Sequence, residues 1–74
     1  MIDKSDNEFL KTIGANVCKY RNKNNISQAQ LAFEINTTLR QIQRIEAGTA
    51  NFRILYLKKI SEILNVKLRA FLDK

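Results

Sequence analysis

The stretch from Ser27 to Gly48 constrains the fold of this chain most, because it has the pattern of two short helices joined by a tight turn. Ser27 is a strong helix N-cap, and Gln30 follows three residues later in the reciprocal capping-box pattern. Asn36 follows the first helix, and asparagine tolerates the left-handed backbone that a sharp helix exit needs. Thr38 then caps a second helix, predicted over residues 39–47, and Gly48 is its natural C-terminal stop.

The rest of the chain also favours helices. Proline is absent, glycine occurs twice, and β-branched residues do not alternate cleanly with polar ones. Three further helices are predicted, over residues 7–23, 53–64 and 66–72, the first of them capped by Asp6 or Ser5. Their inner faces follow the three- and four-residue spacing of Phe9, Leu10, Ile13, Val17 and Tyr20, then of Ile54, Leu57, Ile60 and Leu64, then of Val66, Leu68, Phe71 and Leu72. The sequence therefore predicts a compact, all-α fold of five helices.

Length and composition limit the classes of function. A chain of 74 residues predicts a single domain over residues 1–74, with a folded core at about 7–72. There is no histidine, so the commonest metal ligand and general base are missing, and we expect no enzymatic activity, metal or cofactor. Cys18 stands alone and is interpreted as a half-buried structural residue. We expect a cytoplasmic protein without membrane contact, because the apolar runs are too short to span a bilayer and no signal-peptide pattern is present.

The predicted helix 39–47 has one polar side and one apolar side. Arg40, Gln43 and Arg44 stand at positions i, i+3 and i+4 and share a face, while Ile42 and Ile45 lie on the other side. Arginine and glutamine pair bidentately with guanine and adenine edges in the major groove. The formal net charge of +6 suits a polyanionic partner, although it also favours solubility. We therefore predict that these three side chains read double-stranded DNA; a solvated charged face is the alternative.

Neighbouring residues fit the same interpretation. Gln28 lies at the first turn of its helix, where backbone amides favour a phosphate, or it is a solvated capping residue. Leu39 could meet a thymine methyl group or pack within the protein. Gln41 could reach a base edge or a phosphate. Thr38 is expected to cap its helix first, although its hydroxyl can also contact DNA.

This ordered set of residues resembles the helix-turn-helix domains of the Cro/phage-repressor type, the XRE family, from about residue 13 to residue 71. The resemblance rests on Ile13-Gly14, Val17, Arg21, Ser27-Gln28, Leu31-Ala32, Ile42, Arg44-Ile45-Glu46, Gly48, Leu57, Ile60 and Leu64-Asn65-Val66. It implies five helices in a lambda-repressor-like arrangement, with the DNA-binding unit at helices two and three, and usually a homodimer. It also implies an ion pair between Arg21 and Glu46, a phosphate contact at Gln28, and a loop that follows the DNA backbone through Thr49, Asn51 and Arg53.

The C-terminal third carries more apolar residues than so small a core needs. The surplus consists of Leu55, Tyr56, Ile63, Phe71 and Leu72. We interpret these residues as a homodimer interface, with ordinary packing within the chain as the alternative.

The sequence thus predicts a homodimeric, sequence-specific DNA-binding transcriptional regulator of the phage-repressor or restriction-modification-controller type. It acts on a two-fold operator, and no small-molecule ligand is implied. The alternative is a protein-interaction module that kept this fold and lost DNA binding. Phe33 supports the alternative, because it stands opposite Leu31 and Ile35, where the family is normally polar.

Overall fold

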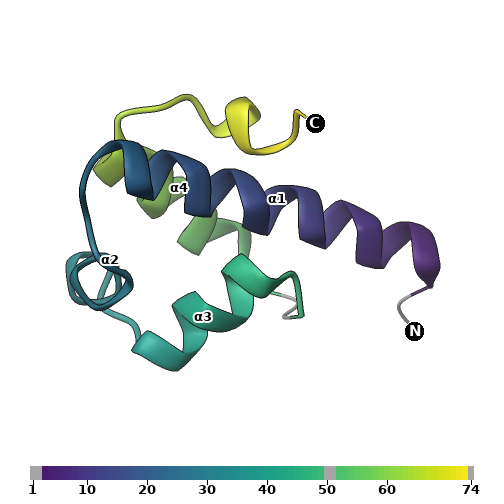
Figure 1. Ribbon diagram of the computed structural model, residues 1–74, viewed down its shortest axis with the longest axis horizontal. Helices are drawn as coiled ribbons and strands as arrows, with labels where there is room; N and C mark the ends of the chain where they lie inside the picture. The colour runs from purple at the N-terminus through teal and green to yellow at the C-terminus, as the bar shows by residue number, and fades with distance from the viewer. Residues whose placement is uncertain (1–2, 50–51, 74) are drawn as a thin grey trace.

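The computed structural model describes residues 3–49 and 52–73, and these form helices without any β-strand. The elements are α1 (Lys4–Lys23), α2 (Gln28–Glu34), α3 (Leu39–Ala47), α4 (Ile54–Leu64) and the 3-10 helix η1 (Leu68–Phe71). α1 runs along the length of the molecule, with α2 and α3 on one side of it and η1 on the other (Figure 1). The predicted all-α class is confirmed.

The predicted fifth helix over residues 66–72 is wrong, because four α-helices are followed by a single 3-10 turn. Asn65 ends α4 in the left-handed conformation, with φ of 56°, and Lys67 is extended. The extended backbone at Lys67 delays the next element to Leu68, and η1 then runs for only four residues, the usual length of a short 3-10 piece. Phe71 anchors that turn, since its side chain has no exposed surface.

The first helix begins earlier than its predicted start at Asn7. Asp3 is the N-cap, because its carboxylate accepts a hydrogen bond from the Asp6 backbone N–H at 2.9 Å. The Asp3 backbone N–H donates to the Asp6 carboxylate at 3.3 Å in return, which completes a capping box. Neither Asp6 nor Ser5 is therefore the cap, and α1 is 20 residues long.

Every helix contributes to one core. Its members are the buried apolar residues Ile13, Val17, Leu31, Ala32, Ile35, Ile42, Ile45, Leu57, Ile60, Leu64 and Phe71. Three residues of the predicted inner faces lie outside it and are exposed, Phe9 by 53%, Ile54 by 68% and Leu72 by 45%. The first turns of α1 extend beyond the elements that cover the rest of the helix (Figure 1), so helical spacing alone could not bury Phe9.

The turns follow the sequence closely. Asn36 and Gly48 have the predicted left-handed conformation; Asn25 adopts it between α1 and α2, and Asn65 adopts it at the end of α4. The Ser27 hydroxyl accepts from the Gln30 N–H at 3.0 Å, as predicted. The reciprocal half of that capping box is not formed, because the Gln30 amide donates to Glu34 instead, at 2.8 Å. No described helix has the length and apolar character needed to cross a membrane.

Candidate nucleic-acid interface

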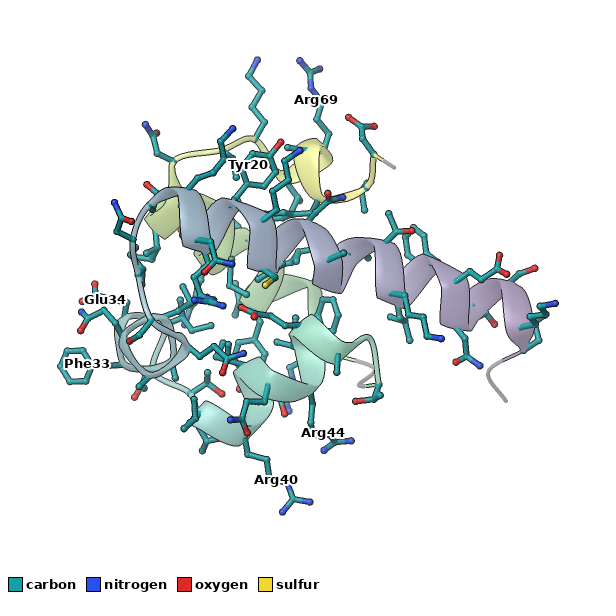
Figure 2. All side chains as sticks on the ribbon, viewed as in Figure 1. Tyr20, Phe33, Glu34, Arg40, Arg44 and Arg69 are labelled. Atoms are coloured by element: carbon teal, nitrogen blue, oxygen red, sulfur yellow. The ribbon has the colours of Figure 1, made fainter. Side chains whose placement is uncertain are left out.

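α3 presents a polar face to solvent because its apolar face is held in the core. Ile42 and Ile45 have no exposed surface, whereas Arg40, Gln43 and Arg44 are exposed. Figure 2 shows Arg40 and Arg44 extending from α3 away from the body of the molecule. The predicted division of this helix into a buried side and an Arg/Gln side is therefore confirmed.

Local interactions define both ends of α3. The Thr38 hydroxyl accepts a hydrogen bond from the Gln41 N–H at 3.1 Å, which is the predicted cap. Gly48 ends the helix with φ of 72°, a conformation that glycine adopts at little cost. The Thr49 N–H then donates to the Arg44 carbonyl at 3.1 Å. These bonds hold the Arg/Gln face in a defined position before any ligand arrives.

A close backbone contact fixes the position of α3 against α1. Gly14 is buried in α1 beside the last turn of α3, where a Cβ atom would lie 2.7 Å from the carbonyl oxygen of Glu46. That separation is far below an ordinary van der Waals contact. The two helices can therefore approach this closely only where α1 has no side chain.

An ion pair ties the same end of α3 to α1, as the resemblance implied. Arg21 Nε donates to Glu46 Oε2 at 2.6 Å, and Arg21 Nη2 donates to Glu46 Oε1 at 3.1 Å. The two side chains are only 11% and 6% exposed. The hydrogen bond to Glu46 raises the pKa of Arg21 and outweighs the lowering caused by burial. The one acidic residue of α3 is thus neutralised by a buried partner.

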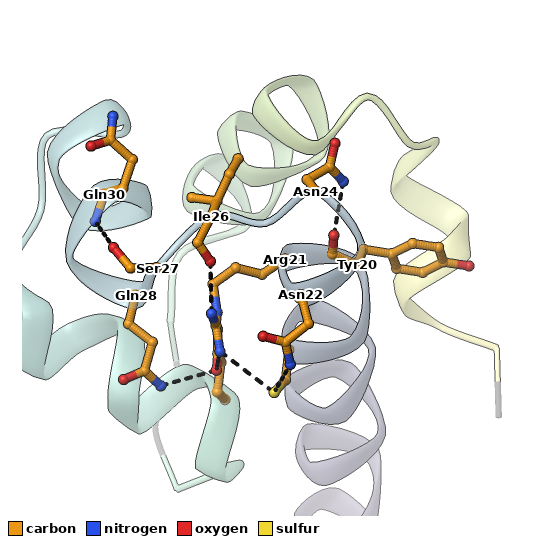
Figure 3. A network of polar contacts seen from close by, with 10 residues as sticks. Tyr20, Arg21, Asn22, Asn24, Ile26, Ser27, Gln28 and Gln30 are labelled. Carbon is orange, nitrogen blue, oxygen red and sulfur yellow. Dashed lines mark hydrogen bonds and ion pairs between the residues drawn. The ribbon is translucent and has the colours of Figure 1, made fainter.

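Two neighbours complete this network (Figure 3). Arg21 Nη1 donates to the Ile26 carbonyl at 2.7 Å, which ties the loop before α2 to α1. The Gln28 side-chain amide donates to Glu46 Oε1 at 3.0 Å. Gln28 is therefore half-buried against Glu46 rather than fully solvated. Its phosphate contact stays a prediction, one that the second N–H of the amide and the backbone at the start of α2 would serve.

The other predicted DNA contacts fall into different environments. Leu39 is 43% exposed at the start of α3, and Gln41 is half-buried. Thr49 is exposed beside the end of α3, and Arg53 is the exposed N-cap residue of α4, without a side-chain capping bond. Asn51 lies outside the described residues. α3 thus brings the central predicted contacts together, whereas Arg53 is placed on a separate element.

The predicted dimer residues divide into surface and core. Leu55 is 51% exposed and Leu72 is 45% exposed, while Tyr56 and Ile63 are partly buried against the core. The prediction for Phe71 is wrong. Its ring packs edge-on against Tyr20, with 6.0 Å between the ring centroids, and leaves no surface for a partner.

An apolar groove lies between the first half of α1, the start of α4 and the C-terminal segment. It encloses about 290 Å³ and is lined by Phe9, Leu10, Ile13, Phe52, Ile54, Leu57 and Leu72. Sequence reasoning missed this groove, because Phe9 and Ile54 have the spacing of core residues. No local signal distinguishes them, since their exposure depends on where distant segments end.

Other side chains are placed as expected or stand apart. Phe33 is 78% exposed on α2 and points into solvent (Figure 2). Cys18 is half-buried, and its sulfur accepts from Arg21 and Asn22 at 3.7 and 3.5 Å, which agrees with the structural role predicted for it. Within residues 3–49 and 52–73, no group of three or more His, Cys, Asp or Glu residues could hold a metal ion.

Comparison with known proteins matches the chain to the helix-turn-helix family HTH_3 over residues 19–71. The restriction-modification controller protein C.AhdI from Aeromonas hydrophila superposes with a TM-score of 0.82, at 22% identity over 88% of this chain and 94% of that one. An HTH_3 family transcriptional regulator from Vibrio cholerae gives 0.80, at 24% identity over 89% of this chain but 37% of its own. At such identities the two structures support the fold alone. No curated protein sequence matches the chain.

Proposed function

Because this chain belongs to the helix-turn-helix family HTH_3 of DNA-binding transcriptional regulators, we propose that it recognises a two-fold operator as a homodimer. The observation that carries the proposal is the Arg/Gln face of α3. Its three long polar side chains are exposed, and the helix that bears them is fixed by buried residues on its other side. In the proposed complex α3 enters the major groove, and the two half-sites lie about one helical turn (~34 Å) apart.

Each polar group has a proposed role in this complex. Arg40 and Arg44 donate to guanine O6 and N7, and Gln43 pairs with an adenine edge. Thr38, Leu39 and Gln41 contact bases or phosphates around them. Gln28, Thr49, Asn51 and Arg53 contact the backbone, which sets the register without reading sequence. The buried Arg21–Glu46 pair supports recognition by keeping a free carboxylate away from phosphate.

The homodimer is proposed to form through the apolar surface of the groove. We define this surface by the exposed groove residues Phe9, Ile54 and Leu72, together with the exposed Leu55, which follows Ile54 on α4 but does not line the groove. Exposed apolar side chains that gather in one place mark an interaction site more often than scattered ones do. A two-fold contact would use the same surface of both subunits. Leu55 and Leu72 are retained from the sequence prediction, whereas Tyr56 and Ile63 are partly buried against the core.

Selection of bound duplexes from a random DNA pool tests the function directly. The proposal expects enrichment of a two-fold symmetric sequence, and an affinity that falls steeply as salt rises, because bound phosphates release counterions. Recovery of unrelated sequences would exclude specific recognition. To distinguish a phage-type repressor from a restriction-modification controller, the selected operator must also be located in the genome, since the gene beside it identifies what is regulated.

The exposed Phe33 supports a second candidate, a protein-interaction module of the same fold. Its aromatic ring is 78% exposed on α2, at a position where the family resemblance implies a polar residue. An apolar protein interface predicts little dependence of affinity on salt, whereas DNA binding predicts a strong one. A salt titration on duplex DNA therefore separates the two candidates.

A further inference from the structure

Four basic residues are carried by the C-terminal half of α1, beside Tyr20, and by the segment at η1 that packs against it. They are Lys19, Lys23, Lys67 and Arg69, here called the second basic face, and all four are exposed. The ammonium groups of Lys19 and Lys23 lie 5.2 and 5.7 Å from the centre of the Tyr20 ring. Figure 2 shows Arg69 and Tyr20 on one side of the molecule and Arg40 and Arg44 on the other.

Packing between α1 and η1 assembles this face. The Tyr20 ring meets Phe71 of η1, and the Asn16 side-chain amide donates to the Phe71 carbonyl at 2.9 Å. Lys67 and Arg69 are thereby brought beside the C-terminal half of α1. Two segments that are far apart in the sequence thus contribute two cations each to one surface.

The second basic face is rich in cations that lack local acids. Residues 9–33 and 63–72 contain no Asp or Glu, and Asp73 is the nearest acid along the chain, with one charge against four. The ion pairs found in the described residues, Arg21–Glu46 and Lys58–Glu62, involve none of the four. Lys23 also lies in the last turn of α1, where the helix dipole favours a cation. Lys67 and Arg69 lie outside α1, so the dipole of that helix does not explain why cations stand at these two positions.

Such a face fits a polyanion, and its surroundings favour nucleic acid over a membrane. Membrane-surface binding combines basic residues with apolar side chains that enter the lipid. The exposed large apolar residues of the described chain are Phe9, Phe33, Leu39, Ile54, Leu55 and Leu72. None of them stands among the four cations, and Leu72, the nearest along the chain, lines the groove beside Phe9. A phosphate backbone needs only spaced cations.

The same duplex cannot occupy both basic surfaces of one subunit. The molecule measures 32 × 23 × 19 Å, and Figure 2 separates the two surfaces along the middle dimension. A major groove is only about 8.5 Å deep, so a helix inside it leaves the opposite face well outside the duplex. We propose that the second basic face binds the phosphate backbone of a second DNA segment, without reading its sequence, so that one subunit can hold two segments together.

The first test uses a background in which the Arg/Gln face is removed. In an R40A/R44A variant, a short random-sequence duplex should still bind in a salt-dependent manner. A plot of log affinity against log salt has a negative slope. Adding K67Q/R69Q or K19Q/K23Q should make this slope shallower by about 0.9 for each phosphate that the variant no longer neutralises. Adding K58Q/K59Q is the matched control, since it also removes two positive charges, and it should change the slope less.

The outcomes are distinct. If all three pairs made the slope equally shallower, the effect would come from net charge alone and the proposal would be overturned. The absence of residual binding in R40A/R44A would overturn it as well. Binding to phosphatidylglycerol vesicles through these lysines, without binding to the duplex, would also overturn it. An unchanged helical spectrum of each variant shows that the fold is intact. Failure of the proposed function appears separately, as an R40A/R44A variant that still selects the operator.

Bridging provides the second readout. The unmodified chain saturates an immobilised operator duplex, and a labelled random duplex is then added. The wild-type chain and K58Q/K59Q should retain the label, while K67Q/R69Q should retain several-fold less with its operator affinity nearly unchanged. Equal retention by all three proteins would contradict the proposal.

Discussion

At the scale of single residues, Glu46 shows how a carboxylate is accommodated in a helix that is proposed to face a polyanion. Because Arg21 and Glu46 are buried together, Glu46→Ala leaves a guanidinium unpaired and should lower the free energy of unfolding by ~1–3 kcal/mol. Thermal melts of Glu46→Ala, Arg21→Ala and the double variant measure the coupling, which should make the double variant less unstable than the sum. Lys58→Ala breaks an exposed pair and should cost well under about 1 kcal/mol. Strict additivity would mean that the two buried charges are not coupled.

Gly14→Ala should lower the stability of the fold, although helix propensity alone predicts that it raises it. Gly→Ala within a helix normally stabilises a protein by up to about 1 kcal/mol. Here the new Cβ would meet the backbone of α3, so Gly14→Ala should destabilise the fold by about 1–3 kcal/mol. Ala15→Gly at the exposed neighbouring position is the control, with an expected loss of about 1 kcal/mol from propensity alone. A Gly14→Ala protein that melts higher than the wild type would show that the helices can move apart without cost.

At the scale of elements, α3 acts as one unit whose buried side orients its exposed side. Arg44→Ala should weaken binding to the selected operator by about 1–3 kcal/mol and relax the preference at one symmetric pair of positions. Lys59→Ala, on α4, should leave the preference unchanged. Anisotropy titrations on the operator and on single-base variants measure both effects. A loss that is uniform over all duplexes would instead assign Arg44 to the phosphate backbone.

At the scale of the whole molecule, the apolar surface of the proposed dimer interface would let so small a fold bury more apolar area and present two recognition helices with two-fold symmetry. Ile54→Asp or Leu55→Asp would place a charge in the proposed interface and should give a monomer with poor operator affinity and an intact helical spectrum. These positions are better tests than Tyr56 or Ile63, which support the core. Phe33→Asp is the matched control, because it changes an apolar residue on α2 that is more exposed than Ile54 or Leu55.

Sedimentation equilibrium at micromolar concentration decides the dimer prediction. A wild-type chain that stays monomeric, both free and on DNA, would exclude the homodimer. Dimerisation that survives Ile54→Asp and is lost in Phe33→Asp would move the interface to α2.

What the sequence by itself determined is local in origin. The caps at Ser27 and Thr38, the left-handed exits at Asn36 and Gly48, and the two-sided character of α3 depend on residues within one or two helical turns. The identity of the Arg/Gln face follows from the same short-range geometry. The Arg21–Glu46 pair required the family resemblance as well, because its members are distant in the chain.

The tertiary structure alone decided which apolar residues are buried and which polar groups meet. Phe71 enters the core while Phe9 and Ile54 remain exposed, although all three have helical apolar spacing. Gln28 turns toward Glu46, and the last segment winds into η1 instead of an α-helix. The physical reason is that burial depends on where other helices begin and end, whereas spacing within one helix specifies only which residues share a side.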